Sequence, residues 1–187
     1  MQNGICRHRK HLRMLHSAWE ELGPVSDRAT TGRGQETGPN ARKLAMDLIG
    51  TWQLKEWIST LDGVDHGHPF GRDAQGCITY TADGFMSAIL MRPDRPAFTH
   101  ANFASGSEAE KLAAASGYIS YAGVFRIEGK RVIHEVGFSL LPNWIGTELV
   151  REISWTTDIP AQLILTALPE TTRSGKVVVN RLRWARQ

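Results

Sequence analysis

The sequence predicts an all-β domain of eight antiparallel strands with one short helix. From residue 47 onward, apolar and polar residues alternate over short segments, as they do in half-buried strands. Turn sequences such as Ala82-Asp83-Gly84 and Glu128-Gly129-Lys130 separate these segments. Eight antiparallel strands of this length either close into a barrel or stack as a sandwich.

Each predicted strand covers one alternating segment and ends at a turn signal or a proline. The Pro-rich stretch 92–96, for example, ends the third strand because proline cannot donate to a strand ladder. In chain order the predicted strands span residues 48–59, 75–81, 85–91, 118–127, 131–139, 147–156, 162–168 and 175–186.

The predicted helix lies between the third and fourth strands. Ser107 followed by Glu110 is a capping box, and residues 108–115 are strong helix formers. Gly117 supplies the signal that ends the helix.

We interpret residues 1–45 as a basic N-terminal extension and residues 47–187 as the domain. The extension has eight Lys or Arg against four acidic residues, a charge of +4. Because the whole chain carries +3, residues 46–187 carry −1. Residues 23–40 contain too little apolar surface to offset their ordering entropy, so we expect a disordered linker. Residues 11–22 could form a short helix, and Met46 is an alternative start of translation.

Charge and composition argue against several classes of protein. A nearly neutral domain has no electrostatic footprint for nucleic acid. The apolar runs are too short to cross a membrane as helices, and the basic residues 7–10 are not followed by the apolar stretch of a secretory signal. With only two cysteines, Cys6 and Cys77, a reducing compartment is favoured, so we expect a cytoplasmic protein.

An ordered series of motifs runs through the domain. It opens with Gly-x-Trp at Gly50-Thr51-Trp52 and continues with Pro69-Phe70-Gly71, residues 80–87, 91–96 and 117–123, His134, residues 141–147, Arg151 and Trp184. In this order the motifs of residues 47–187 resemble those of the lipocalin-like domain family, whose members form a calycin-type β-barrel. The resemblance implies an eight-stranded antiparallel up-and-down barrel with the short helix between strands three and four.

The resemblance also implies how one end of the barrel is closed. In calycin barrels the tryptophan of the Gly-x-Trp motif packs against an arginine of the last strand. Trp52 is that tryptophan here, and Arg181 or Arg183 is the matching arginine. A guanidinium over an indole face is favourable by about 0.5–2 kcal/mol.

The two-residue period of a strand predicts which side chains face the interior. On the first strand, Glu56 and Ile58 are expected on the face of Trp52, and on the fifth, Phe138 on the face of His134. The interior is therefore expected to be mainly apolar, and its few polar groups are expected to be Glu56, Tyr80, His134 and Arg151.

Two aromatic residues complete the candidate ligand-binding set. Trp144 lies in a connection between strands, where an amphipathic indole suits the rim of a pocket. Tyr118 and Tyr121 fall on opposite faces of their strand, so at most one of them lines the cavity. The candidates are Glu56, Tyr80, Tyr121, His134, Trp144 and Arg151.

An apolar interior with a few orienting polar groups predicts a pocket for a small hydrophobic molecule. Our first hypothesis is a non-catalytic binder. The alternative is a cofactor-independent cyclase or isomerase, with His134 as general acid or base and Arg151 steadying an enolate. A third hypothesis is a structural domain with a filled core. None of these needs a cofactor, and the oligomeric state is left open.

A metal site is the least favoured reading of the domain's other histidines. His66-Gly67-His68 with Asp73 loosely matches the ligand spacing of a cupin site. The segment is rich in Gly and Pro, however, and histidines in turns are usually solvated. We therefore predict no metal site.

Overall fold

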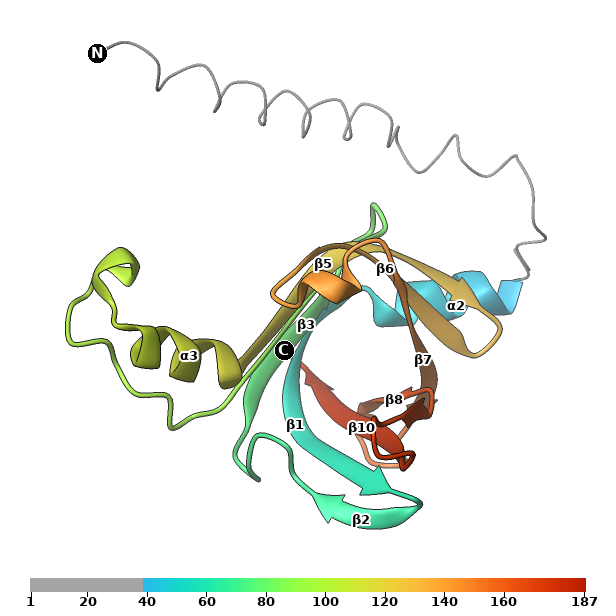
Figure 1. Ribbon diagram of the computed structural model, residues 1–187. Helices are drawn as coiled ribbons and strands as arrows, with labels where there is room; N and C mark the ends of the chain where they lie inside the picture. Colours follow the sequence, from blue (N-terminus) through green and yellow to red (C-terminus); the bar gives the residue numbers. More distant parts are fainter. Residues whose placement is uncertain (1–38) are drawn as a thin grey trace. The chain divides into compact units, whose positions relative to one another are not determined.

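The computed structural model describes residues 39–187, which form one strongly curved antiparallel sheet with helices attached (Figure 1). The expected helix at 11–22 and residues 23–38 of the expected linker lie outside the described residues. The linker's last two residues, 39 and 40, are helical, so the expectation is wrong there. The helical elements are α2 (Pro39–Leu48), α3 (Glu108–Ser116) and the short 3-10 turns η1 (Phe103–Ser105) and η2 (Pro142–Trp144). The strands are β1 (Gly50–Leu61), β2 (Val64–Gly67), β3 (Gln75–Tyr80), β4 (Phe85–Met91), β5 (Tyr118–Glu128), β6 (Arg131–Ser139), β7 (Glu148–Trp155), β8 (Leu163–Ala167), β9 (Glu170–Thr171) and β10 (Val177–Arg186).

Eight of these strands close into a barrel. They neighbour one another in the order β1-β3-β4-β5-β6-β7-β8-β10, and β10 pairs back with β1 along most of its length. The short strands β2 and β9 extend the sheet beside β1 and β10. Closure pairs each of the eight barrel strands on both sides, so only the short strands β2 and β9 keep a free edge. The predicted eight-stranded antiparallel barrel is thus confirmed.

The predicted elements are present with small shifts of their ends. Each predicted strand matches an observed one to within a residue or two. The helix α3 begins with the predicted capping box, in which the Ser107 hydroxyl accepts from the Glu110 backbone N–H. Strands β2 and β9 were not predicted because they are short and exposed and lack apolar alternation.

Helix α2 changes the predicted start of the first strand. Residues 39–48 are helical, so the first strand begins at Gly50 and not at residue 48. The helix ends on the fully buried Leu48, whose carbonyl accepts a 2.8 Å hydrogen bond from the Trp52 indole N–H. Residues 39–45, assigned from the sequence to the extension, are part of this helix, which contacts β5. No helix among residues 39–187 is long and apolar enough to cross a membrane.

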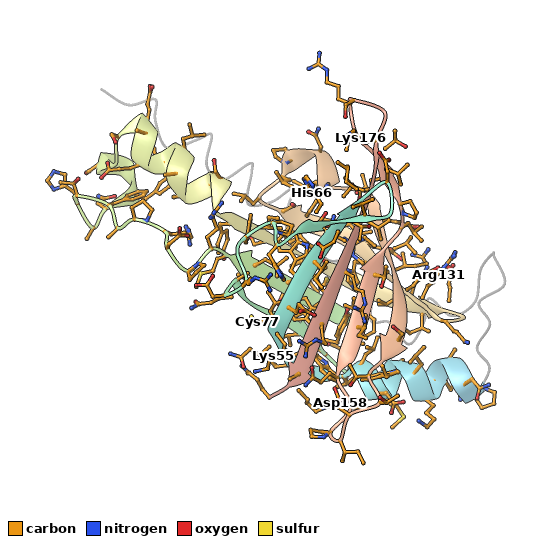
Figure 2. All side chains as sticks on the ribbon, turned by 90° about the horizontal axis from the view of Figure 1, so that it is seen from below. Lys55, His66, Cys77, Arg131, Asp158 and Lys176 are labelled. Carbon is orange, nitrogen blue, oxygen red and sulfur yellow. The ribbon has the colours of Figure 1, made fainter. Side chains whose placement is uncertain are left out.

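A β-bulge in β1 changes which side chains face inward. Leu54 pairs with Trp184 of β10, but the next β1 pair is Glu56 with Arg183, which leaves Lys55 unpaired. The buried positions accordingly switch from Trp52 and Leu54 to Trp57 and Ser59. The expectation that Glu56 and Ile58 share the face of Trp52 is therefore wrong. Lys55 and Cys77, both labelled in Figure 2, lie on the paired strands β1 and β3.

A second bulge, at Gly137 in β6, has the same effect on Phe138. Gly123 of β5 pairs with Val136, whereas Ala122 pairs with Phe138. Val132, His134 and Val136 are buried as expected, but Phe138 is 47% exposed. Its predicted place on the inner face is wrong because the extra residue reverses the alternation.

One end of the barrel is closed by Trp52 and Arg186. The Arg186 guanidinium lies 4.3 Å from the centre of the Trp52 ring and donates to the backbone carbonyls of Asp47 and Ile49. The predicted tryptophan–arginine pair is present, but its assignment to Arg181 or Arg183 is wrong. The ladder places Arg186 opposite Trp52 and Arg181 opposite Ile58, too far along the strand.

We predict that Gly123→Ala destabilises the barrel. A Cβ at this position would collide with the Glu135 carbonyl oxygen of the paired strand. Overpacking of this kind costs about 1–3 kcal/mol in free energy of unfolding, measurable by urea titration. Gly137→Ala is the control, because its nearest neighbour would be 3.9 Å away. Equal losses for both variants would contradict the explanation.

We also predict that Arg186→Ala lowers the free energy of unfolding by about 1–2 kcal/mol, through loss of the cation–π contact and the hydrogen bonds to the backbone. Arg181→Ala, on the exposed face of the same strand, is expected to change it by less than about 0.5 kcal/mol. Thermal and urea unfolding of both variants provide the measurement. A larger effect at Arg181 would argue against this closure.

Candidate functional site: a cavity inside the barrel

The barrel encloses a mainly apolar cavity of about 150 Å³. Its walls come from every barrel strand except β6, together with η2 and β9, and buried apolar side chains pack the rest of the interior. The lining residues are Trp57, Ile78, Ala88, Leu90, Ile119, Tyr121, Trp144, Arg151, Leu165, Ala167, Glu170, Asn180, Leu182 and Trp184. Apolar walls with few polar groups are typical of small-molecule sites.

Next to the cavity, His134 lies between two tyrosine hydroxyls. The Tyr80 hydroxyl is 2.8 Å from His134 Nε2, and the Tyr121 hydroxyl is 3.2 Å from His134 Nδ1. The three side chains come from β3, β6 and β5, and each is at most 8% exposed. The inward faces of these strands thus bring together three of the residues proposed from the sequence.

Burial keeps this group of residues uncharged. Desolvation, aided by the positive charge of Arg151, lowers the pKa of His134 to about 3. Desolvation also raises the pKa values of Tyr80 and Tyr121, and the charge of Arg151 partly opposes both increases. At neutral pH the network is therefore a chain of neutral hydrogen-bonding groups.

Because His134 is neutral, the proton positions in the Tyr80–His134–Tyr121 network can be assigned. A neutral imidazole has one N–H donor and one bare nitrogen. Among the described residues, Tyr80 has no hydrogen-bond partner other than His134, so its buried O–H would be unpaired unless it donates to Nε2. Nδ1 then carries the proton and donates to the Tyr121 oxygen. The Tyr121 O–H is left to donate toward the cavity that Tyr121 lines.

Arg151 contributes a positive charge to the same region. It lies on β7 opposite Val132 of β6, which places it diagonally across from His134 on the inner face. Its guanidinium donates to the Val150 carbonyl at 2.9 Å. Within residues 39–187, no ion pair joins Arg151 to a carboxylate.

Trp144 on η2 forms part of the cavity wall, as expected for a rim residue. Its ring packs edge-on against Tyr121, with ring centres 5.6 Å apart. Tyr118 is directed elsewhere and lies under the Arg95 guanidinium, 4.9 Å from ring centre to guanidinium carbon. Of the two tyrosines of β5 that the sequence left open, Tyr121 is the one at the cavity.

Glu56 is the candidate that the structure separates from the others. Because of the β1 bulge, it lies on the outer side of the barrel, and its carboxylate is 3.3 Å from Nε of Arg183. Arg183 also donates to the Gln162 side chain at 2.5 Å. Glu56 therefore belongs to a partly exposed polar cluster and does not line the cavity.

Sequence reasoning missed several wall residues. Trp57 was the one large apolar residue on the expected polar face of its strand, and this irregularity was the available signal of a bulge. Its indole N–H donates to the Asn180 side-chain oxygen at 2.9 Å. Trp184 was known from its motif, but nothing local indicated that Asn180 and Glu170 would line the cavity.

His66 and His68, the histidines considered for a metal site, have different surroundings from those of metal ligands. Ring nitrogen Nδ1 of His68 lies 2.9 Å from the Trp57 carbonyl oxygen, while His66 is exposed on β2. Among residues 39–187, no three His, Cys, Asp or Glu side chains converge in a way that could hold a metal ion.

A closed antiparallel barrel of eight strands with an apolar cavity places the chain in the class of hollow β-barrels built to enclose small molecules. A family model, that of the lipocalin-like domain, matches residues 49–187, and the chain belongs to this family. A relative is the 4'-hydroxy-3'-methoxypropiophenone carrier protein ppsC of Aspergillus oryzae. It is 39% identical over 82 residues, which cover 40% of this chain and 74% of the relative.

The low pKa of His134 predicts that acid destabilises the protein. In the unfolded chain the histidine binds a proton near pH 6.5, whereas in the folded protein it does so only near pH 3. The stabilising contribution is complete above pH 6.5 and is lost as the pH falls toward 3. Between pH 7 and pH 5 the loss is about 2 kcal/mol.

The measurement is urea unfolding of wild type and His134→Gln at both pH values. The variant is expected to be less stable at neutral pH but to lose about 2 kcal/mol less on acidification. Replacing the exposed His66 by Gln is the control and should leave the pH dependence unchanged. Parallel pH profiles for wild type and His134→Gln would contradict the prediction.

Proposed function

We propose that this protein binds a small, largely hydrophobic aromatic molecule inside its barrel and releases it unchanged. The observation that carries the proposal is the cavity of about 150 Å³, with apolar walls and donors from Tyr121 and Arg151. An apolar cavity of this size accommodates one aromatic ring. Polar substituents on the ring would meet the tyrosine and the arginine, which fixes its orientation.

The aromatic character of the wall supports a planar ligand. Trp57, Trp144 and Trp184 contribute indole rings, and Tyr121 contributes a phenol ring. Such rings favour offset or edge-on contacts with another aromatic ring. The relative's name, a carrier of a propiophenone, supports an aryl ketone as the ligand class here.

The state of His134 favours binding over the alternative of a cyclase or isomerase. A general base works best with a pKa near the operating pH, whereas the pKa of His134 is about 3. Both ring nitrogens are engaged by tyrosine hydroxyls, and His134 is not among the residues that line the cavity. Its role in the proposal is to hold Tyr121 in place.

The proposal includes a cytoplasmic location and no nucleic-acid partner. Cys77 carries a free thiol, which suits a reducing compartment. The charge of −1 on residues 46–187 gives the domain little attraction for polyanions.

Filling the cavity is expected to abolish binding without unfolding the barrel. Ala167 lines the cavity, so Ala167→Leu places three additional carbons in the space for the ligand. We expect at least about a tenfold loss of affinity for 4'-hydroxy-3'-methoxypropiophenone, followed by calorimetry or tryptophan fluorescence.

Ala185→Leu is the matched control. Ala185 lies on β10 opposite the exposed Gln53, outside the barrel, and its replacement should leave the affinity unchanged. Far-UV circular dichroism checks that both variants fold. If wild type fails to bind aryl ketones and other small aromatic probes, the proposed function is wrong.

A further inference from the structure

Two of the polar side chains that line the cavity, Tyr121 and Arg151, can donate hydrogen bonds to a ligand. Tyr121 presents its O–H, because its oxygen accepts from His134 Nδ1–H in the proton arrangement described above. Arg151 can only donate hydrogen bonds. A ligand that satisfies these groups must bring an acceptor.

The charge of the cavity wall indicates whether the ligand's acceptor is neutral or anionic. Arg151 is half-buried at the cavity and forms no ion pair within the described part of the chain. A positive charge in an apolar interior attracts an anionic oxygen much more strongly than a neutral carbonyl. Glu170, the acidic residue of the lining, is exposed on β9.

The apolar walls and small size of the cavity limit which anionic ligands it can bind. A carboxylate concentrates its charge on one group and is costly to remove from water. A phenolate with an acyl group on its ring spreads the charge over the ring and the ketone oxygen. Such a phenol also ionises more readily than phenol itself, because the ketone stabilises its anion.

We infer that the cavity selects an acyl phenol in its ionised form, with the phenolate oxygen accepting hydrogen bonds from Arg151 and Tyr121. This inference rests on the proposed function and specifies the ligand's charge state. The charged and titratable groups near that oxygen are Tyr121 on β5, Glu170 on β9, and the Tyr80–His134 pair that holds Tyr121.

The test measures the pKa of the bound probe. 4'-Hydroxy-3'-methoxypropiophenone is titrated across neutral pH, alone and with saturating full-length protein, and its phenolate is followed by absorbance at longer wavelength. We expect the pKa of the bound probe to fall by at least about one unit, equivalent to tenfold tighter binding of the anion. The methyl ether 3',4'-dimethoxypropiophenone, which cannot ionise, is titrated in parallel by fluorescence.

Variants then test whether Arg151 causes the pKa shift of the bound probe. Arg151→Met is expected to remove the pKa shift, whereas Arg181→Met, on the exposed outer face, is expected to retain it. Tyr121→Phe removes one donor but keeps the ring, and it is expected to reduce the preference for the anion by about threefold or more. If Arg151→Met does not fold, the inference is tested by the pKa shift of the probe bound to wild type and by the size of that shift in Tyr121→Phe.

The outcomes distinguish this inference from the proposed function. If both probes bind but the pKa of the bound phenol stays at or above its free value, the cavity takes neutral molecules. The inference then fails, while the proposed function stands. If neither probe binds, both fail. A full shift that persists in Arg151→Met overturns the role of Arg151.

Discussion

Pairing of β1 with β10 is the constraint on which the structure depends, because it turns an open sheet into an enclosed volume. The ladder runs from Trp52 and Arg186 at one end to Leu61 and Val178 at the other. At the first end, the arginine that covers the indole also binds the backbone leading out of α2. Gly50 leaves room for this, since a Cβ there would lie 2.7 Å from the guanidinium. Closure, capping and the attachment of α2 therefore form one unit.

Closure makes every polar group inside the barrel costly unless it is paired. The Tyr80–His134–Tyr121 chain meets this requirement among its own members and leaves one hydroxyl donor at the cavity. Breaking either hydrogen bond would leave a buried nitrogen or oxygen unsatisfied. The protein thus holds a polar group in a fixed direction within a largely apolar space. Orientation of a bound ring would come from this fixed direction.

Local patterns were enough to predict the strands and the capped helix, and the resemblance to the lipocalin-like domain family added the barrel. The two-residue period also placed Tyr80, His134 and Arg151 on the inner face, where they lie. These patterns did not locate the bulges at Lys55 and Gly137, because an extra residue leaves no mark in composition and the one irregularity of the pattern, Trp57, did not fix the position of the extra residue. The errors at Glu56 and Phe138 follow directly from these two positions. The choice of Arg186 over the other arginines of β10 depends on long-range register, which no local pattern contains. The sequence did not predict helix α2, because the hydrogen bond that stabilises it, from the Trp52 indole to the Leu48 carbonyl, joins the end of the helix to the start of the strand.

The bulge in β1 also bears on how the length of this strand can vary. With Lys55 unpaired, Lys55 and Glu56 both point outward between the inward Leu54 and Trp57. A chain shorter by this one residue would regain strict alternation and still present Leu54 and Trp57 to the interior. A deletion of Gln53 would instead make Trp52 and Leu54 neighbours and place these two inward side chains on opposite faces of the strand. The bulge is therefore a site at which the strand can change its length without altering the cavity wall.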